Sequence, residues 1–272
     1  MVDELFDGAA AAGLRLRAYV LEDGSTDCTP DVLREWQSRR PVDVVRVPPP
    51  PPAAEGAAWA EHTKGAYQLN RDEAVRQRRY QQMALLRDHL TKFVLDDPTF
   101  QADVVAAYDA DQGSGWASAN ILKGIGAVAS GRYDSICGNG IVAQANPHRF
   151  VHRDLLALRI SDFEDQPDAG VELAAPGPAW DDGARNVAAC FGGLAVYDAS
   201  IFRDDGCSYD YGHVPGSNDW DCEHVVLARC LADHGRSTTL LPNLIINGPF
   251  LTTKRRRIVR RWAPDGSARD HL

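Results

Sequence analysis

The feature that most constrains the fold is residues 15–47, where a strand pattern, a helix pattern and a second strand pattern follow one another. The apolar run of RLRAYVLED ends in acidic residues, DVLREWQSR has apolar side chains at helical spacing, and VDVVRV is again strand-like. Pro30 suits the first turn of the helix, which Asp27 or Thr29 can cap. A strand, a crossover helix and a second strand predict a parallel pair, and therefore an α/β fold.

The rest of the chain continues this alternation. We expect helices at 2–12, 71–90, about 115–130 and 222–235, and strands at 102–111, 133–139, 186–198 and 238–247. The strand at 186–198 has a glycine pair at its centre, and segments 161–186 and 207–220 are typical of loops. A run of prolines at 48–52 ends the second strand and opens a surface loop. No repeat or linker divides the 272 residues, so we expect a single domain.

Charge and hydropathy exclude several classes of protein. The net charge is −9, and setting aside the six positive charges of KRRRIVRRW at 254–262 leaves −15 for the rest of the chain. An acidic body argues against nonspecific nucleic-acid binding, so we expect no nucleic-acid partner. No apolar stretch approaches the ~20 residues that cross a bilayer, and no secretory signal begins the chain. We expect a cytoplasmic protein without a membrane span, or a Golgi-lumenal one if an anchor precedes these residues.

The six cysteines are dispersed and form no CxxC pair, so reduced thiols are the default expectation. Cys222, His224, Cys230 and His234 suggest zinc, because positions 230 and 234 lie one helical turn apart. The apolar stripe of the same helix favours the other interpretation, in which the cysteines are ordinary core residues.

Two acidic clusters follow strand ends in the first half of the chain. One is Glu22-Asp23-Gly24-Ser25-Thr26-Asp27, and the other is Asp109-Ala110-Asp111. Ligands of open α/β sheets bind outside the carboxyl ends of the strands, so we expect both clusters on one rim. Carboxylates such as Asp109 and Asp111 suit Mg²⁺ or Mn²⁺ bridging a diphosphate. An Asp-X-Asp pair alone is weak evidence, because solvated aspartates on turns are common.

In combination, EDGSTDCT and YDADQ, about 80 residues apart, resemble the layout of nucleotide-sugar glycosyltransferases with the GT-A fold. Further segments resemble a divergent branch that includes capsule-associated and algal-virus-type sugar transferases. These segments are AVRQRRYQQMALLRDHL, YDSICGNG, HRDLLALR, CFGGLAVYD, CEHVVLARCLADHG and LLPNLIINGP. They occur in the family's order and cover roughly residues 15–250.

The resemblance implies roles for the acidic turns and for one arginine. Glu22 and Asp23 would contact the base or ribose of the donor, while Ser25 and Asp27 shape their turn. Arg87, on the helix before the second acidic turn, would be a partner for the donor phosphates or for the aspartates.

The resemblance also implies the metal and acceptor sides of the site. Asp109, which also belongs to the donor site, would bind the metal with Asp111. Glu223 is the preferred catalytic base and Asp221 the reserve. His224 occupies the place of an expected acid and is a further candidate metal ligand.

The expected fold is thus a GT-A, Rossmann-like, mostly parallel mixed sheet flanked by helices. Residues 1–253 would form the domain, with a nucleotide-binding half at 1–125, an acceptor half at 126–253 and a basic tail at 254–272. The expected activity is Mn²⁺- or Mg²⁺-dependent hexosyl transfer from a UDP- or GDP-linked sugar to a glycan or glycoconjugate hydroxyl, inverting or retaining. The alternative is an inactive binding module, because only about fourteen residues precede the first strand and His224 replaces an acid.

Overall fold

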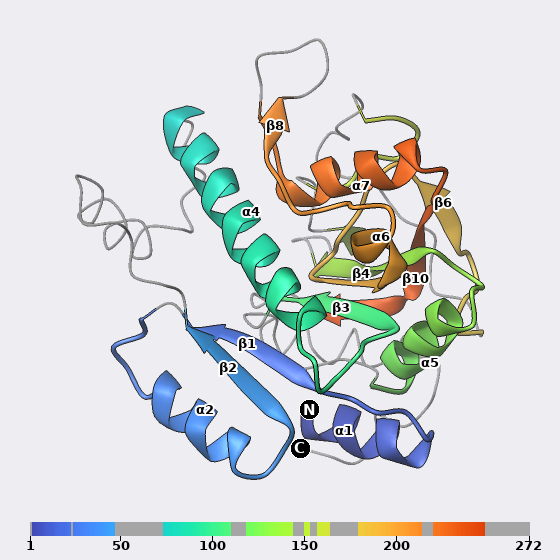
Figure 1. Ribbon diagram of the computed structural model, residues 1–272. Coiled ribbons are helices and arrows are strands. Elements are labelled where there is room, and N and C mark those ends of the chain that lie inside the picture. The colour runs from blue at the N-terminus through green and yellow to red at the C-terminus, as the bar shows by residue number, and fades with distance from the viewer. Residues whose placement is uncertain are drawn as a thin grey trace.

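The computed structural model describes residues 2–22, 24–46, 73–109, 118–143, 150–152, 157–163, 179–213 and 220–247. The first half of the chain forms α1 (Val2–Ala11), β1 (Ala18–Glu22), α2 (Thr29–Gln37), β2 (Val42–Arg46), α4 (Glu73–Leu95), β3 (Val104–Tyr108) and α5 (Ser118–Ala129). The second half forms β4 (Ser135–Ala143), β5 (Phe150–His152), β6 (Arg185–Val187), β7 (Leu194–Asp198), α6 (Ser200–Arg203), β8 (Gly212–His213), β9 (Trp220–Asp221), α7 (Glu223–Asp233) and β10 (Thr238–Asn247). The architecture is mixed α/β, as expected (Figure 1).

The main sheet has the strand order β3-β7-β4-β10-β6, and β5 pairs with β4. Among the described strands of this sheet only β4 and β10 are parallel neighbours, and the other pairs are antiparallel. The expectation of a mostly parallel sheet is therefore wrong. It assumed a helical crossover before each strand, but within the described residues no helix lies between β4 and β7, and antiparallel strands need none.

Both faces of the main sheet are buried. Alternate residues of β7 point to opposite faces, because side chains alternate along a strand. Ala195 and Tyr197 join a cluster with residues of α6 and α7, and Leu194 and Val196 join one with residues of α1 and α5. Figure 1 accordingly shows α4 and α7 on one side of the sheet and α5 on the other.

Strands β1 and β2 form the predicted parallel pair, with α2 as the crossover helix. Within the described residues this pair is a separate two-stranded sheet. It is tied to the segment after α4, because Tyr19 Oη donates to Asp97 Oδ2 at 2.7 Å and Arg17 Nη1 lies 3.1 Å from the same oxygen. These two bonds place β1 beside the C-terminal part of α4.

The segment 186–198 is two strands rather than the one expected. Gly192 and Gly193, with φ of 62° and 88°, form the turn that precedes β7 instead of the centre of a strand. Gly192 also packs on the backbone of Gly138 and Gly140 in β4, where a Cβ would overlap the Gly138 carbonyl oxygen. Both glycines are needed here for backbone conformation, and Gly192 for close approach as well.

We expect Gly192→Ala to lower the free energy of unfolding by about 2 kcal/mol more than Gly206→Ala. Both residues have positive φ, but the Cβ of residue 206 would meet nothing within 4 Å. Urea unfolding of the two variants measures the difference. Equal stabilities would show that β4 can move away from the turn without cost.

Four of the six cysteines form disulfides, Cys137 with Cys190 and Cys207 with Cys230. The expectation of reduced thiols is therefore wrong for these four. Their Cα atoms lie 5.9 and 5.7 Å apart across 53 and 23 residues of sequence, so tertiary packing brings each pair together. Cys28 and Cys222 form no disulfide; Cys28 is exposed and Cys222 is buried.

Segment 207–220, expected to be a loop, contains the short strand β8 and the first residue of β9, and the two strands pair antiparallel.

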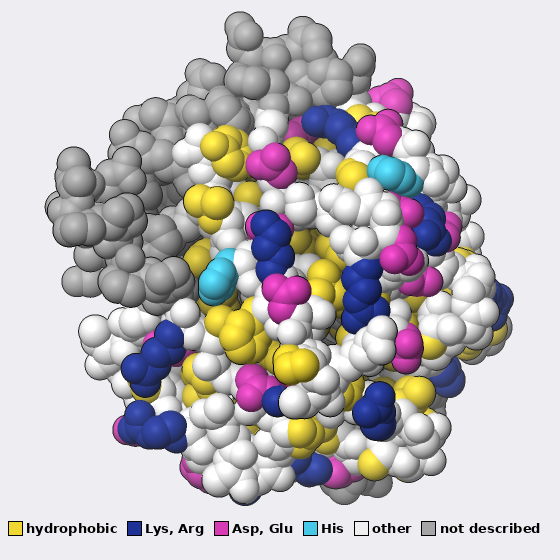
Figure 2. Space-filling view, in the orientation of Figure 1, with side chains coloured by type: hydrophobic (Ala, Val, Ile, Leu, Met, Phe, Trp, Pro, Cys, Tyr) yellow, Lys and Arg dark blue, Asp and Glu magenta, His cyan; other side chains and the backbone are white. Residues whose placement is uncertain are grey.

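Over the face in Figure 2, the described acidic and basic side chains are interspersed. No helix in the described part of the chain has both the length and the apolar character to span a bilayer. The proline run and the basic tail lie outside the described residues.

Candidate active site

Three predicted site residues from distant parts of the chain are in contact, because the guanidinium group of one of them, Arg87, bonds to the carboxylates of the other two. Arg87, in the middle of α4, donates from Nη2 to Asp109 Oδ1 at 2.6 Å and from Nε to Glu223 Oε1 at 2.9 Å. Asp109 directly follows β3, and Glu223 is the first residue of α7. The Arg87 and Glu223 side chains are 13% and 7% exposed, whereas Asp109 is 32% exposed. The Arg87 cluster, meaning these three residues, therefore opens to solvent mainly at Asp109.

The turn before β7 fixes the position of Asp109. The backbone N–H of Asp109 donates to the Gly193 carbonyl oxygen at 3.1 Å, continuing the pairing of β3 with β7 by one residue. The same turn carries Phe191, whose ring lies 4.8 Å from the guanidinium carbon of Arg87. One turn thus contacts both the carboxylate and the cation of the cluster.

His224 lies against the Arg87 cluster from the buried side. Its imidazole stacks on Phe191 with ring centroids 3.7 Å apart and planes at 16°, and Tyr209 meets it edge-on at 5.4 Å. Neither ring nitrogen has a hydrogen-bond partner, and Nε2 lies 3.6 Å from Glu223 Oε1. Burial, and then the charge of Arg87, hold the pKa of His224 well below its usual range. The imidazole is therefore neutral beside the carboxylate.

The charges of the cluster favour an ionised arginine. Burial acts to lower the pKa of Arg87, but Asp109 and Glu223 together raise that pKa above its ordinary value. Burial raises the pKa of Tyr209 to about 12, so its phenol stays neutral. One cation therefore faces two carboxylates, and the cluster carries a net negative charge that suits a cation more than an anion.

Asp221, the reserve base, lies outside this cluster. Its side chain is fully buried, and Oδ1 accepts a hydrogen bond from Arg159 Nη2 at 2.5 Å while Oδ2 accepts one from Arg229 Nη2. Two arginines thus occupy both oxygens, an arrangement typical of a structural ion pair. Glu223, and not Asp221, is linked to Asp109, because Arg87 donates to both Glu223 and Asp109.

The carboxylates of Glu22 and Asp27 in the first acidic turn accept hydrogen bonds from backbone N–H groups of the same short segment. Glu22 Oε1 accepts the N–H groups of Gly24 and Ser25 at 3.0 and 2.5 Å, and Asp27 Oδ1 accepts that of Thr29 at 2.8 Å. The Ser25 N–H is the main cause of the lowered pKa of Glu22. Among the described residues no hydrogen bond or ion pair links this turn to the Arg87 cluster. Asp23 lies outside the described residues, so convergence of the two acidic turns stays a prediction.

Sequence reasoning missed two aromatic residues of the site. Phe191 had a signal, because it directly precedes a glycine pair that lets backbone segments approach closely. Tyr209 had none, because it lies in a segment interpreted only as a loop. Both contact His224, and therefore set the burial of that residue.

The described residues near Arg87 include side chains of the types that bind divalent metal ions, but they do not form a complete set of ligands. Asp109 offers a partly exposed carboxylate, and His224 is neutral with two unpartnered nitrogens, as a metal ligand requires. Asp109, Glu223 and His224 do not place three ligand atoms within 4.8 Å of one another, and the one described group that does so lies at the other end of α7. Asp111 lies outside the described residues, so the metal stays a proposal.

Comparisons with known proteins leave the family open. No protein-family model and no curated protein matches the sequence. Among solved structures, the crystal structure of S. aureus TarS, residues 1–349, is similar with a TM-score of 0.42 and 10% sequence identity. The match covers 94% of this chain but only 57% of that chain. At this TM-score neither the fold nor the activity of that protein can be assigned to this chain.

Proposed function

We propose that the chain is a glycosyltransferase that moves a hexose from a UDP- or GDP-linked sugar to a hydroxyl group of a glycan or glycoconjugate. The observation that carries the proposal is the Arg87 cluster. It brings a residue expected at the donor phosphates, Asp109, into one ion-pair network with the residue expected at the acceptor, Glu223. In an inverting transfer, one carboxylate can take the proton of the acceptor hydroxyl, and another can help to hold the ion that neutralises the departing diphosphate.

Glu223 is the proposed proton acceptor of an inverting transfer. Its carboxylate takes the proton of the acceptor hydroxyl while that oxygen attacks the anomeric carbon, and the bond from this carbon to the diphosphate breaks. The nucleoside diphosphate leaves with the bonding electrons. His224 packs against the buried side of Glu223 and, because it is neutral, it adds no positive charge that would pair with the carboxylate.

Asp109 and Asp111 are the proposed ligands for Mn²⁺ or Mg²⁺. When bound, such an ion neutralises the diphosphate that departs. Arg87 can serve either its present carboxylate partners or phosphate oxygens, because a guanidinium donates two parallel hydrogen bonds to both kinds of group. We propose that Glu22, Asp23, Ser25 and Asp27 form the nucleoside side of the donor site.

Titration calorimetry with UDP, GDP and their sugar conjugates, with and without Mn²⁺, tests the proposal. We expect binding that Mn²⁺ strengthens, and Asp109→Asn should weaken the Mn²⁺-dependent binding at least about tenfold. Asp31→Asn is the control, because Asp31 is an exposed α2 residue with 73% side-chain exposure. Absence of binding to any nucleotide would refute the proposal. A nucleotide affinity that is the same with and without Mn²⁺ would refute the proposed role of the metal ion.

One observation favours a second candidate, a catalytically inactive module that binds nucleotides or glycans. Arg87 already donates to Asp109 Oδ1 at 2.6 Å, which makes this carboxylate oxygen less available to a metal ion. Assays of sugar-nucleotide hydrolysis and transfer separate the two candidates, because either activity would exclude an inactive module.

A further inference from the structure

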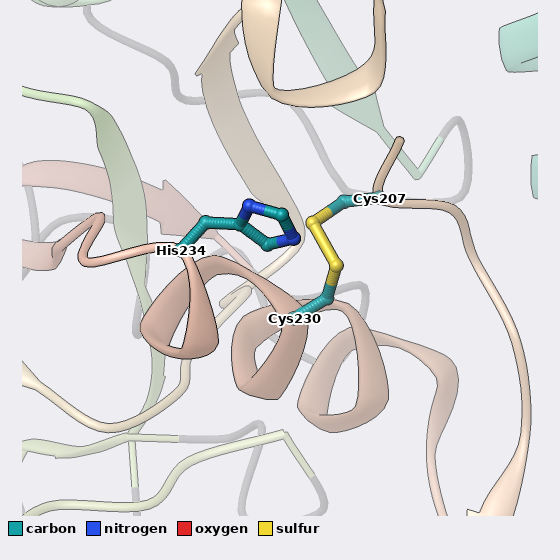
Figure 3. A group of neighbouring side chains, drawn as sticks. All are labelled: Cys207, Cys230 and His234. Carbon is teal, nitrogen blue, oxygen red and sulfur yellow. A yellow bond between two sulfur atoms is a disulfide. The ribbon is translucent and has the colours of Figure 1, made fainter. Parts of the chain in front are cut away.

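Cys207, Cys230 and His234 form a compact group away from the Arg87 cluster. One potential ligand atom of each lies within 4.8 Å of those of the other two. Cys230 is on the last turns of α7, His234 is its C-cap residue, and Cys207 lies in the segment after α6. Figure 3 shows the imidazole of His234 pointing toward the disulfide between the two cysteines. The residues therefore share one small volume.

Contacts other than the disulfide hold these two segments together. Arg236, two residues after His234, donates from Nε to Asp205 Oδ2 at 2.9 Å and from Nη2 to Ser200 Oγ at 3.1 Å. On the other segment, the N–H of Cys207 donates to the Ile201 carbonyl oxygen of α6 at 3.1 Å, which fixes the Cys207 backbone. The approach of the segments therefore does not depend on the sulfur-sulfur bond alone, and reduction should leave the three side chains near one another.

The group has one buried side and one open side. Cys207 is buried, Cys230 is partly buried and His234 is exposed. A reductant and a metal ion can therefore arrive along the side of His234. Two cysteine thiolates, which form only on reduction, and an imidazole are donors that zinc prefers.

We propose that reduction of the Cys207–Cys230 disulfide converts this group into a zinc site. A phosphine or dithiol reductant supplies two electrons, the sulfur-sulfur bond breaks, and each sulfur becomes a thiol. Zn²⁺ then displaces the two thiol protons and is held by two thiolates, the imidazole of His234 and a water molecule. The disulfide and the ion are alternative crosslinks between α7 and the segment after α6.

The proposal differs from the zinc pattern that the sequence suggests. That pattern included Cys222 and His224, which lie at the other end of α7. His224 stacks on Phe191 in the candidate active site. Cys207, which no helical spacing relates to Cys230, takes their place.

Cobalt binding to the full chain carrying Cys28→Ser tests the proposal. The protein is reduced with a phosphine under argon, desalted, checked by thiol titration and titrated with Co²⁺ and then Zn²⁺. We expect a near-ultraviolet thiolate-to-cobalt absorption band with about one ion per chain, displaced by Zn²⁺, and none in oxidised protein. The melting temperature of the reduced protein should rise when Zn²⁺ is added.

Matched variants separate this site from adventitious binding. Cys230→Ser should abolish the band, and His234→Gln should weaken Zn²⁺ binding at least about tenfold. His89→Gln, an exposed histidine on α4, and the double variant Cys137→Ala with Cys190→Ala should leave both unchanged. No band in protein whose thiols are reduced, or a band unchanged in Cys230→Ser or His234→Gln, would overturn the proposal. Because His234 is exposed, its variant remains a test if a cysteine variant fails to fold.

Discussion

Replacing Arg87 by methionine is expected to lower the free energy of unfolding by about 3 to 5 kcal/mol. The substitution keeps most of the side-chain volume but removes the charge that two carboxylates share. Glu223 is 7% exposed and would lose the Arg87 Nε donor, and Asp109 would lose that of Nη2. The charge of the largely buried Glu223 would then have no ion-pair partner at Arg87, and the charge of the partly exposed Asp109 would lie at the same site. Chemical denaturation monitored by circular dichroism measures the change.

Lys92→Met is the matched control for Arg87→Met. Lys92 lies on the same helix and pairs with Asp88 at 2.6 Å, but its side chain is 67% exposed. Exposed pairs four residues apart contribute at most about 0.5 kcal/mol. Adding Glu223→Gln to Arg87→Met should recover part of the loss, because one of the two unpaired charges is removed. A loss below about 1 kcal/mol for Arg87→Met would show that the ion pairs do not stabilise the fold.

Replacing Glu223 by glutamine is expected to lower kcat for sugar transfer about 10²- to 10⁴-fold, with nucleotide binding unchanged. Glutamine keeps the shape of the side chain, and its carbonyl oxygen can still accept the Nε–H of Arg87. It cannot take a proton from the acceptor. Steady-state kinetics together with calorimetry separate the loss of turnover from any loss of binding.

Glu35→Gln is the control for Glu223→Gln, because Glu35 is an α2 residue with 71% side-chain exposure and should not affect turnover. Unchanged kcat, or a change confined to KM, would remove Glu223 from the proposed role.

Local structure was predictable wherever short-range patterns decide it. Pro30 lies in the first turn of α2, and Gly235, with φ of 72°, follows the end of α7. The strand expected at 238–247 is β10 with the same bounds. Each of these features depends on side-chain periodicity or on a residue with restricted or unusual backbone freedom, which the sequence states directly.

Long-range features were not predictable in the same way. Nothing in their spacing pairs Cys137 with Cys190, because the contact of β4 with the segment before β7 brings them together. Strand direction was misjudged for a similar reason, since it depends on which strands become neighbours and not on the pattern of each. The sequence shows the glycine pair at 192–193, but only the positive φ angles of the two residues reveal a turn.

The candidate site was predictable in part. The family-like segments predicted site roles for Arg87, Asp109, Glu223 and His224, and the structure brings these four side chains together. They also predicted a role for Asp221, and no local signal indicates that Arg159 and Arg229 bond to its carboxylate. The partners of a buried charge come from distant segments, so a motif can name a residue without naming its role.

The disulfide between Cys137 and Cys190 has a consequence for the proposed donor site. Phe191 is the next residue along the chain, and its ring supports both the Arg87 guanidinium and the His224 imidazole. Because the disulfide bonds Cys190 to Cys137 of β4, we expect the backbone of the adjacent Phe191 to shift little. If a diphosphate binds here as proposed, we expect the long Arg87 side chain, and not the Phe191 ring, to adjust to it.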